Sequence, residues 1–271
     1  MIRRAGGNLR VLHGEAPDAA RQLERDGYAL VKGVLTPDEV AALRDELAAL
    51  FDAPSDHPAD QAGEFRHGTL NHSPLAQKAV SARGILDAIE PLLGEDCHVI
   101  ANTTWRNPPG HKGGAWHIDA GPHVPRDEGV PWPDNIAYPV FAIGVHLFLQ
   151  DCPLEAGPTA VLAGAHRSGR LPPRDRAFDM DLTYDNRAPV LLAAKAGDAA
   201  MFVSDVWHRG TPDQGDIGRF FLQIHYGRRD IAQRILSTYE VNHLSQEAIA
   251  RAETPRDKTV IGLHDRYFYD A

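Results

Sequence analysis

The chain has 271 residues, 43% of them hydrophobic, with 24 glycines and 20 prolines. This length gives one large domain or two small ones, with enough apolar mass for a sizeable core. The net charge of −9 argues against a nucleic-acid binder, whose binding face would be basic. No apolar run approaches the length of a membrane span. We therefore expect neither a nucleic-acid partner nor a membrane association.

The cysteines and the first residues bear on the cellular compartment. Cys97 and Cys152 stand far apart and show no spacing typical of a disulfide framework or a zinc site. The opening MIRRAGGNLR lacks the apolar stretch of a secretory signal. These features favour a cytoplasmic protein with reduced thiols.

The N-terminal third favours helices. Thr36, Pro37 and Glu39 form the pattern of an N-cap, a first helical residue and the acid that closes a capping box. A second helix is predicted over residues 81–93, ended by Gly94. The first helix is expected to pack through apolar residues at helical spacing, which are Val40, Leu43, Leu47 and Leu50.

Strands dominate from about residue 97 onward. Runs of aliphatic and aromatic residues bounded by turn residues predict strands over 28–35, 98–105, 138–150, 197–208 and 218–227. Helices followed by many antiparallel strands favour a mainly β fold, a double-sheet barrel with helical outworks. We expect a single domain over residues 1–271, with three parts. These are a mostly helical support at about 15–95, a β core at about 97–230 and a C-terminal extension at 231–271.

A possible metal motif lies in the stretch WHIDAGPH, which begins at Trp116. Residues two apart on a strand point to the same face, so His117 and Asp119 would project together while Ile118 turns into packing. One imidazole and one carboxylate are two-thirds of the facial triad that suits non-haem Fe(II). A His-x-Asp pair is common by chance, so a third ligand is needed. The best candidate is His208, at the end of an apolar strand.

Arg219 begins the next predicted strand, eleven residues after His208. Its face of that strand also carries Phe221, Gln223 and His225, so the arginine is expected to point inward. Burial of an unpaired guanidinium costs several kcal/mol. A dicarboxylate cosubstrate would neutralise this charge through a bidentate contact.

Together, His117-x-Asp119, His208 and Arg219 resemble the phytanoyl-CoA dioxygenase family of Fe(II)/2-oxoglutarate-dependent oxygenases. Two further segments are similar to the family's N-terminal strand and capped helix and to its central turn. They are DGYALVKGVLTPDEVAALRDEL and LQDCPLEAGPTAVLAGAHRSG. The second departs from the family pattern at Ala156 and over residues 163–165, which are turn positions.

The resemblance implies a double-stranded β-helix, the jelly-roll or cupin-like fold. It implies iron held by His117, Asp119 and His208, and the distal carboxylate of 2-oxoglutarate bound by Arg219. Thr103 matches a polar side chain that assists the cosubstrate from the preceding strand. The implied chemistry consumes O2, converts 2-oxoglutarate to succinate and CO2, and hydroxylates an unactivated C–H bond.

Asp119 bears on the outcome of that reaction. Related halogenases carry a small residue in place of this carboxylate, so its presence favours hydroxylation, or a desaturating or ring-forming variant, over halogenation. Two other functions remain open. A cupin-like iron enzyme that does not use 2-oxoglutarate would not need Arg219, and a non-catalytic β-barrel binding module would use none of these residues.

The substrate is not identified by any residue. A small-molecule metabolite is favoured over a fatty acyl-CoA, because no basic patch suits the phosphates of CoA. Two irregular stretches, 120–135 and 166–187, have the length of functional lids. His111 and His123 are candidates for substrate contact, His146 and His225 are expected to be satisfied sheet histidines, and His166 is expected to support a turn.

Overall fold

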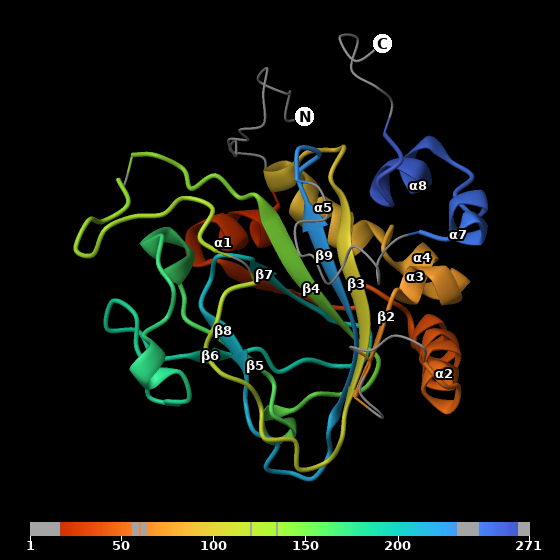
Figure 1. The fold of residues 1–271 in the computed structure, drawn as a ribbon, viewed down its shortest axis with the longest axis horizontal. Helices are drawn as coiled ribbons and strands as arrows, with labels where there is room; N and C mark the ends of the chain where they lie inside the picture. Colours follow the sequence, from red (N-terminus) through yellow and green to blue (C-terminus); the bar gives the residue numbers. More distant parts are fainter. Residues whose placement is uncertain are drawn as a thin grey trace.

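Two antiparallel sheets face each other, and helices cover the outer side of the larger one (Figure 1). The computed structural model describes residues 17–55, 60, 64–119, 121–133, 135–231 and 244–264. The larger sheet has the order β1 (Tyr28–Val31), β7 (Ala199–Val203), β4 (Ala142–Phe148), β9 (Arg219–Gly227), β3 (His98–Asn107) and β2 (Phe65–His67). The smaller sheet has the order β6 (Val190–Leu191), β5 (Thr159–Val161) and β8 (His208–Gly210). This arrangement is the predicted jelly roll.

Strand β9 separates the two hydrophobic cores of the protein. Leu222, Ile224 and Tyr226 point to the outer core, which the helices cover. Phe221 points the other way, into the core between the two sheets. This period-two alternation confirms the predicted faces of the strand and places Arg219 on the inner one.

The two helices that the sequence predicts form at the residues that signal them. The Thr36 hydroxyl accepts a hydrogen bond from the Glu39 backbone N–H at 3.3 Å, and the Glu39 carboxylate accepts one from the Thr36 N–H at 3.0 Å. This capping box begins α2, and Gly94 follows the last residue of α5. The α-helices among the described residues are α1 (Asp18–Asp26), α2 (Pro37–Asp52), α3 (Thr69–His72), α4 (Pro74–Ala79), α5 (Arg83–Leu93), α7 (Gln246–Ala250) and α8 (Pro255–Val260).

Several predicted strands are too long. The strand predicted over 28–35 ends at Val31, because the chain turns at Gly33, whose φ is +60° and whose N–H donates to Asp198. The strand predicted over 138–150 is only β4. The segment 197–208 divides into β7 and the start of β8, because the chain crosses there from the larger sheet to the smaller one.

The strand ends place the candidate ligands. The crossing from β7 to β8 delivers His208 to the smaller sheet, while β9 brings Arg219 across the gap from the larger sheet. Short 3-10 turns lie in the loops between β4 and β6, at Leu154–Ala156, Ala165–Ser168 and Arg174–Arg176. Among the described helices, none has the length and apolar character needed to span a membrane.

Candidate metal and cosubstrate site

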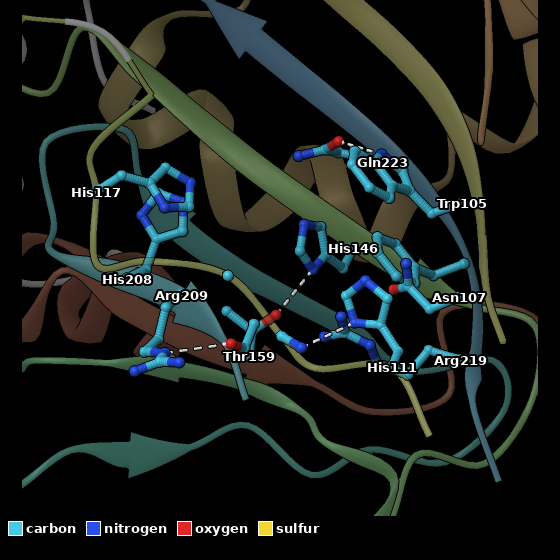
Figure 2. Close-up of a pocket in the computed structure, with 14 residues that line it drawn as sticks. Trp105, Asn107, His111, His117, His146, Thr159, His208, Arg209, Arg219 and Gln223 are labelled. Atoms are coloured by element: carbon cyan, nitrogen blue, oxygen red, sulfur yellow. Dashed lines mark hydrogen bonds between the residues drawn. The ribbon is translucent and has the colours of Figure 1, made fainter. Parts of the chain in front are cut away.

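The backbone joins the two predicted histidine ligands directly. The His117 N–H donates to the His208 carbonyl at 2.9 Å, and the His208 N–H donates to the His117 carbonyl at 3.0 Å. Such a reciprocal pair puts both side chains on the same face of the sheet. The two imidazole centroids are 4.3 Å apart, and Figure 2 shows the rings side by side at one end of the cavity. Ile118 packs into the inter-sheet core, as predicted, and Trp116 packs there beside it.

Asp119 completes the cluster. Its N–H donates to the Ser204 carbonyl at 3.2 Å, and its Oδ1 lies 3.4 Å from His208 Nε2. One possible ligand atom from each of His117, Asp119 and His208 lies within 4.8 Å of the others. The structure thus brings together the three residues that the sequence singles out.

Hydrogen bonds orient both imidazoles for metal binding. His117 Nδ1 donates to the Ala115 carbonyl at 2.8 Å, and His208 Nδ1 donates to the Val206 carbonyl at 2.9 Å. Because a carbonyl only accepts, Nδ1 carries the proton in each ring and Nε2 presents its lone pair to the cluster. Two imidazole nitrogens and a carboxylate suit a divalent iron.

The charges of the cluster also suit a cation. Burial opposes ionisation of Asp119, but the neighbouring imidazoles of His225 and His208 outweigh it and hold its pKa well below the usual range. His117 is partly exposed to solvent, yet burial of its ring and then the proximity of His208 lower its pKa to about 4. Burial would lower the pKa of His208, but Asp119 outweighs that effect and raises it. A metal ion at the cluster would take the place of a proton on His208 Nε2 and would be attracted by the ionised Asp119.

One oxygen of Asp119 supports this fit independently. Oδ2 is buried and accepts no hydrogen bond, and His225 Nε2 lies 3.5 Å from it. A buried carboxylate oxygen without a donor is costly unless a cation or a donor reaches it. The donor set therefore fits a metal ion.

A cavity of about 270 Å³ extends from the cluster between the sheets. Arg219 lines its far end, where Figure 2 shows it beside Asn107 and His111. Arg219 is 6% exposed and its guanidinium forms no ion pair with the described carboxylates, and burial lowers its pKa. Gly210 makes room for it, since a Cβ there would lie 3.0 Å from Arg219 Nη2. The arginine lacks a counter-ion that an anionic ligand would provide.

Two predicted sheet histidines face the site. His146 lines the cavity, and although its Nδ1 lies 3.2 Å from the Thr159 hydroxyl, its buried Nε2 has no hydrogen-bond partner, so the prediction of a satisfied histidine is wrong there. His225 lies in β9 with its Nε2 3.5 Å from Asp119 Oδ2. Period-two alternation from Arg219 already indicates an inward His225, whereas nothing local indicates His146. Asn107, which pairs with Arg219 across β3 and β9, was also missed.

Thr103 lies on the same strand as two residues of the cavity wall, Trp105 and Asn107, but does not itself line the cavity. It is buried and pairs in register with Gln223, whose Oε1 accepts a hydrogen bond from Trp105 Nε1 at 2.5 Å. Its predicted role toward the cosubstrate stays a prediction.

The remaining histidines lie in different surroundings. His111 lines the cavity, and His123 lies 2.6 Å from Asp205 Oδ1 without lining it. His166 supports a turn as predicted, since its ring contacts the Glu24 carbonyl at 3.0 Å. Arg170 of the second loop pairs with Glu128 of the first at 2.8 Å. The lid function of these loops stays a prediction.

The fold and the cluster define a class, the jelly-roll proteins with a two-histidine, one-carboxylate metal site between their sheets. The family model for phytanoyl-CoA dioxygenase (PhyH) matches residues 23–221. The chain belongs to this family.

Relatives of known structure and function agree with this placement. The ectoine dioxygenase of Sphingopyxis alaskensis is 29% identical over 176 residues, which are 58% of this chain and 54% of that protein. The chain therefore matches about half the length of this curated relative. EctD from S. alaskensis, solved with 2-oxoglutarate and 5-hydroxyectoine, has a TM-score of 0.64 at 21% identity, covering 84% of this chain and 83% of that one. The epimerase SnoN, solved with Fe3+, alpha ketoglutarate and nogalamycin RO, has a TM-score of 0.62 at 20% identity, covering 84% and 89%.

Proposed function

We propose that the protein is an Fe(II)/2-oxoglutarate-dependent dioxygenase that hydroxylates an unactivated C–H bond of a small-molecule metabolite, with succinate and CO2 as coproducts. One observation carries the proposal: the His117/Asp119/His208 cluster and the uncompensated Arg219 lie at opposite ends of one cavity. Family membership supports it, as do the 2-oxoglutarate in EctD and the activity named for the ectoine dioxygenase.

The residues would divide the work by position. His117, Asp119 and His208 would hold iron from one side and leave its other coordination positions open to O2, cosubstrate and substrate. Arg219 would fix the distal carboxylate of 2-oxoglutarate, and Thr103 would assist. Bound iron and 2-oxoglutarate would supply the oxidising power. The walls between the sheets would exclude water from the reacting atoms.

The other candidate functions explain less of the site. An iron enzyme without 2-oxoglutarate has no use for a buried arginine at the end of the cavity. A non-catalytic binding module would pay the cost of burying Asp119 and Arg219 without a ligand for either. The substrate proposed is a small-molecule metabolite, since the cavity between the sheets has a volume of about 270 Å³.

The direct test is anaerobic addition of Fe(II) and then 2-oxoglutarate to the purified protein. We expect a weak visible charge-transfer band that requires both additions. A cupin-like enzyme would bind iron but give no band that depends on 2-oxoglutarate, and a non-catalytic module would give neither signal. Either result would contradict the proposal.

The reaction type is tested with a metabolite library scored for substrate-dependent succinate. Each hit is then analysed by mass and chirality. Hydroxylation adds one oxygen atom to the product, desaturation or ring closure removes two hydrogens, and epimerisation leaves the mass unchanged. A product without added oxygen would overturn the hydroxylase assignment while leaving the cosubstrate assignment intact.

A further inference from the structure

The carboxylate of Asp119 has a neighbour, His225, with no role in the proposed function. We infer that His225 is a positioning residue for Asp119: its ring N–H binds Oδ2 of that carboxylate and leaves Oδ1 alone to hold the metal. A six-coordinate iron would then keep three positions for other ligands, two for 2-oxoglutarate and one for O2. The inference rests on the metal site of the proposed function and adds a residue that controls how one ligand binds.

His225 and His208 stand at different oxygens of the Asp119 carboxylate. His225 Nε2 lies 3.5 Å from Oδ2, whereas His208 Nε2 lies 3.4 Å from Oδ1. Oδ2 is buried and accepts no hydrogen bond at this separation. An approach of a few tenths of an ångström would bring His225 Nε2 and Oδ2 within bonding distance. His225 can therefore satisfy the oxygen that the rest of the site leaves without a donor.

The larger sheet makes room for the His225 ring. Gly144 of β4 is the direct partner of His225 on β9, and the two strands lie side by side in Figure 1. A Cβ on Gly144 would lie 3.1 Å from His225 Cδ2, which is tighter than ordinary contact. The glycine thus lets the ring approach β4 closely. Because His225 is only 8% exposed, the surrounding strands hold its ring in place.

The charge of Asp119 decides which group receives the His225 N–H. His225 Nε2 also lies 3.4 Å from the amide nitrogen of Gln223, which only donates, so the ring nitrogen cannot serve both groups. Burial opposes ionisation of Asp119, but the imidazole of His225 does most to hold its pKa low. A hydrogen bond to an ionised carboxylate is about twice as strong as one between neutral groups. The proton therefore belongs on Nε2, facing Oδ2.

Loss of this hydrogen bond would change the coordination of the metal. A carboxylate can bind a metal ion through one oxygen or through both. If both oxygens of Asp119 bound, protein ligands would occupy four positions and leave two, which 2-oxoglutarate alone would fill. O2 would then lack a position beside the substrate. His225 thus keeps a reactive position open without contacting it, as outer partners of metal ligands do.

The test compares variants of His225 in the full chain. His225→Phe keeps a ring and removes the donor. His225→Gln places an amide N–H near the position of Nε2, whereas His225→Asn places it near Nδ1, too far from Asp119 to bond. Tyr226→Phe is the control, because it removes one buried hydrogen bond, to the Val80 carbonyl, from the other face of β9.

Crystal structures of the Ni(II)-loaded proteins show directly how many oxygens of Asp119 bind the metal. We expect one in the wild type, His225→Gln and Tyr226→Phe, with Oδ2 bonded to the side chain at position 225 in the first two and the control alike. We expect two in His225→Phe and His225→Asn, because neither variant offers Oδ2 a donor.

Nitric oxide reports the remaining position, because it binds Fe(II) as a substitute for O2 and gives an EPR signal. It is added anaerobically to each protein with Fe(II) and 2-oxoglutarate. The wild type, His225→Gln and the control should bind it alike. His225→Phe and His225→Asn should bind it at least about tenfold more weakly, as is typical for loss of an outer partner of a metal ligand. Before 2-oxoglutarate is added the difference should be smaller, since more positions are then open.

The outcomes separate this inference from the function on which it rests. Two bound oxygens of Asp119 in the wild type would overturn the inference, as would a single bound oxygen in every variant. Equal loss of nitric oxide binding in His225→Gln and His225→Phe would also overturn it, since the donor would then not matter. A wild type that binds nickel through one oxygen but does not bind 2-oxoglutarate would refute the proposed function and leave the role of His225 intact. If His225→Phe fails to fold, His225→Gln and His225→Asn decide.

Discussion

The candidate metal ligands are held by backbone hydrogen bonds as much as by their own side chains. His117 and His208 are bridged to each other, and each ring is fixed through Nδ1 to a carbonyl two residues earlier in the chain. The ligand geometry therefore exists before a metal arrives. Binding should cost little reorganisation, and its strength should depend on the three ligand atoms.

Removal of one ligand should weaken metal binding sharply. His208→Ala leaves a two-residue site, and we expect its affinity for Ni(II) to fall by at least about tenfold, because loss of only an outer partner of a ligand already costs about 10–100-fold. Competition with a chelating dye measures the affinity. His123→Ala is the control, because His123 does not line the cavity. Wild-type metal affinity in His208→Ala would show that the metal is not held by this cluster.

Arg219 should act on the cosubstrate and leave the metal unaffected. Arg219→Ala removes a buried charged partner of a carboxylate, and such truncations cost about 2–5 kcal/mol. We expect a correspondingly higher Kd for 2-oxoglutarate and an unchanged affinity for Ni(II), both measured by titration. If Arg219→Ala lost metal binding but kept its affinity for 2-oxoglutarate, the role proposed for Arg219 would be wrong.

Strand elements show what the sequence can and cannot predict. The faces of β9 follow from alternation alone, and the start of α2 follows from Thr36 and Glu39, because both signals are local. The end of β1 and the inward position of His146 depend on the register between strands distant in the chain. The metal ligands were predictable because their spacing matches a family, whereas Asn107 carries no such signal.

Glycine inside a central strand marks a close approach between side chains. Gly144 lies in the middle of β4, where a Cβ would come within 2.6 Å of the Phe202 ring and 3.1 Å of the His225 ring. Gly144→Ala should therefore lower the free energy of unfolding by about 1–3 kcal/mol. Urea denaturation measures it. Gly121→Ala is the control, since its Cβ meets nothing within 4 Å, and equal stability of both variants would show that β4 adjusts without cost.

Across the whole molecule, stability should depend on buried neutral histidines. His166 is fully buried, and burial lowers its pKa from 6.5 to about 4. The His166 ring therefore binds a proton below about pH 6.5 in the unfolded chain but only below about pH 4 in the native protein. The free energy of unfolding consequently falls as the pH falls from 6.5 to about 4. For one group this amounts to about 3 kcal/mol.

His166→Gln should remove that share of the acid sensitivity. We expect its free energy of unfolding to fall less steeply than that of the wild type between pH 6.5 and pH 4, whatever its stability at neutral pH. Urea denaturation at several pH values measures both slopes. If the free energy of unfolding fell equally steeply with pH in both proteins, His166 would not be a source of the acid sensitivity.

The bridge between His117 and His208 joins segments that lie far apart in the chain. It adds backbone pairing at β8, a strand of only three residues. A cation bound there would link the segment after β3 to β8, the strand that precedes Arg219 in the chain. Because the unfolded chain offers no such site, metal binding stabilises the folded protein against unfolding. Nickel at about 100 times its wild-type Kd should add about 2.7 kcal/mol to the stability of the wild type, seen as a higher melting temperature. The same nickel concentration should add at most about 1.4 kcal/mol to His117→Ala, if its affinity is at least about tenfold lower. The metal site would then also contribute to the stability of the fold, so the metal-free protein should unfold more readily than the metal-bound protein although its ligands are already in place.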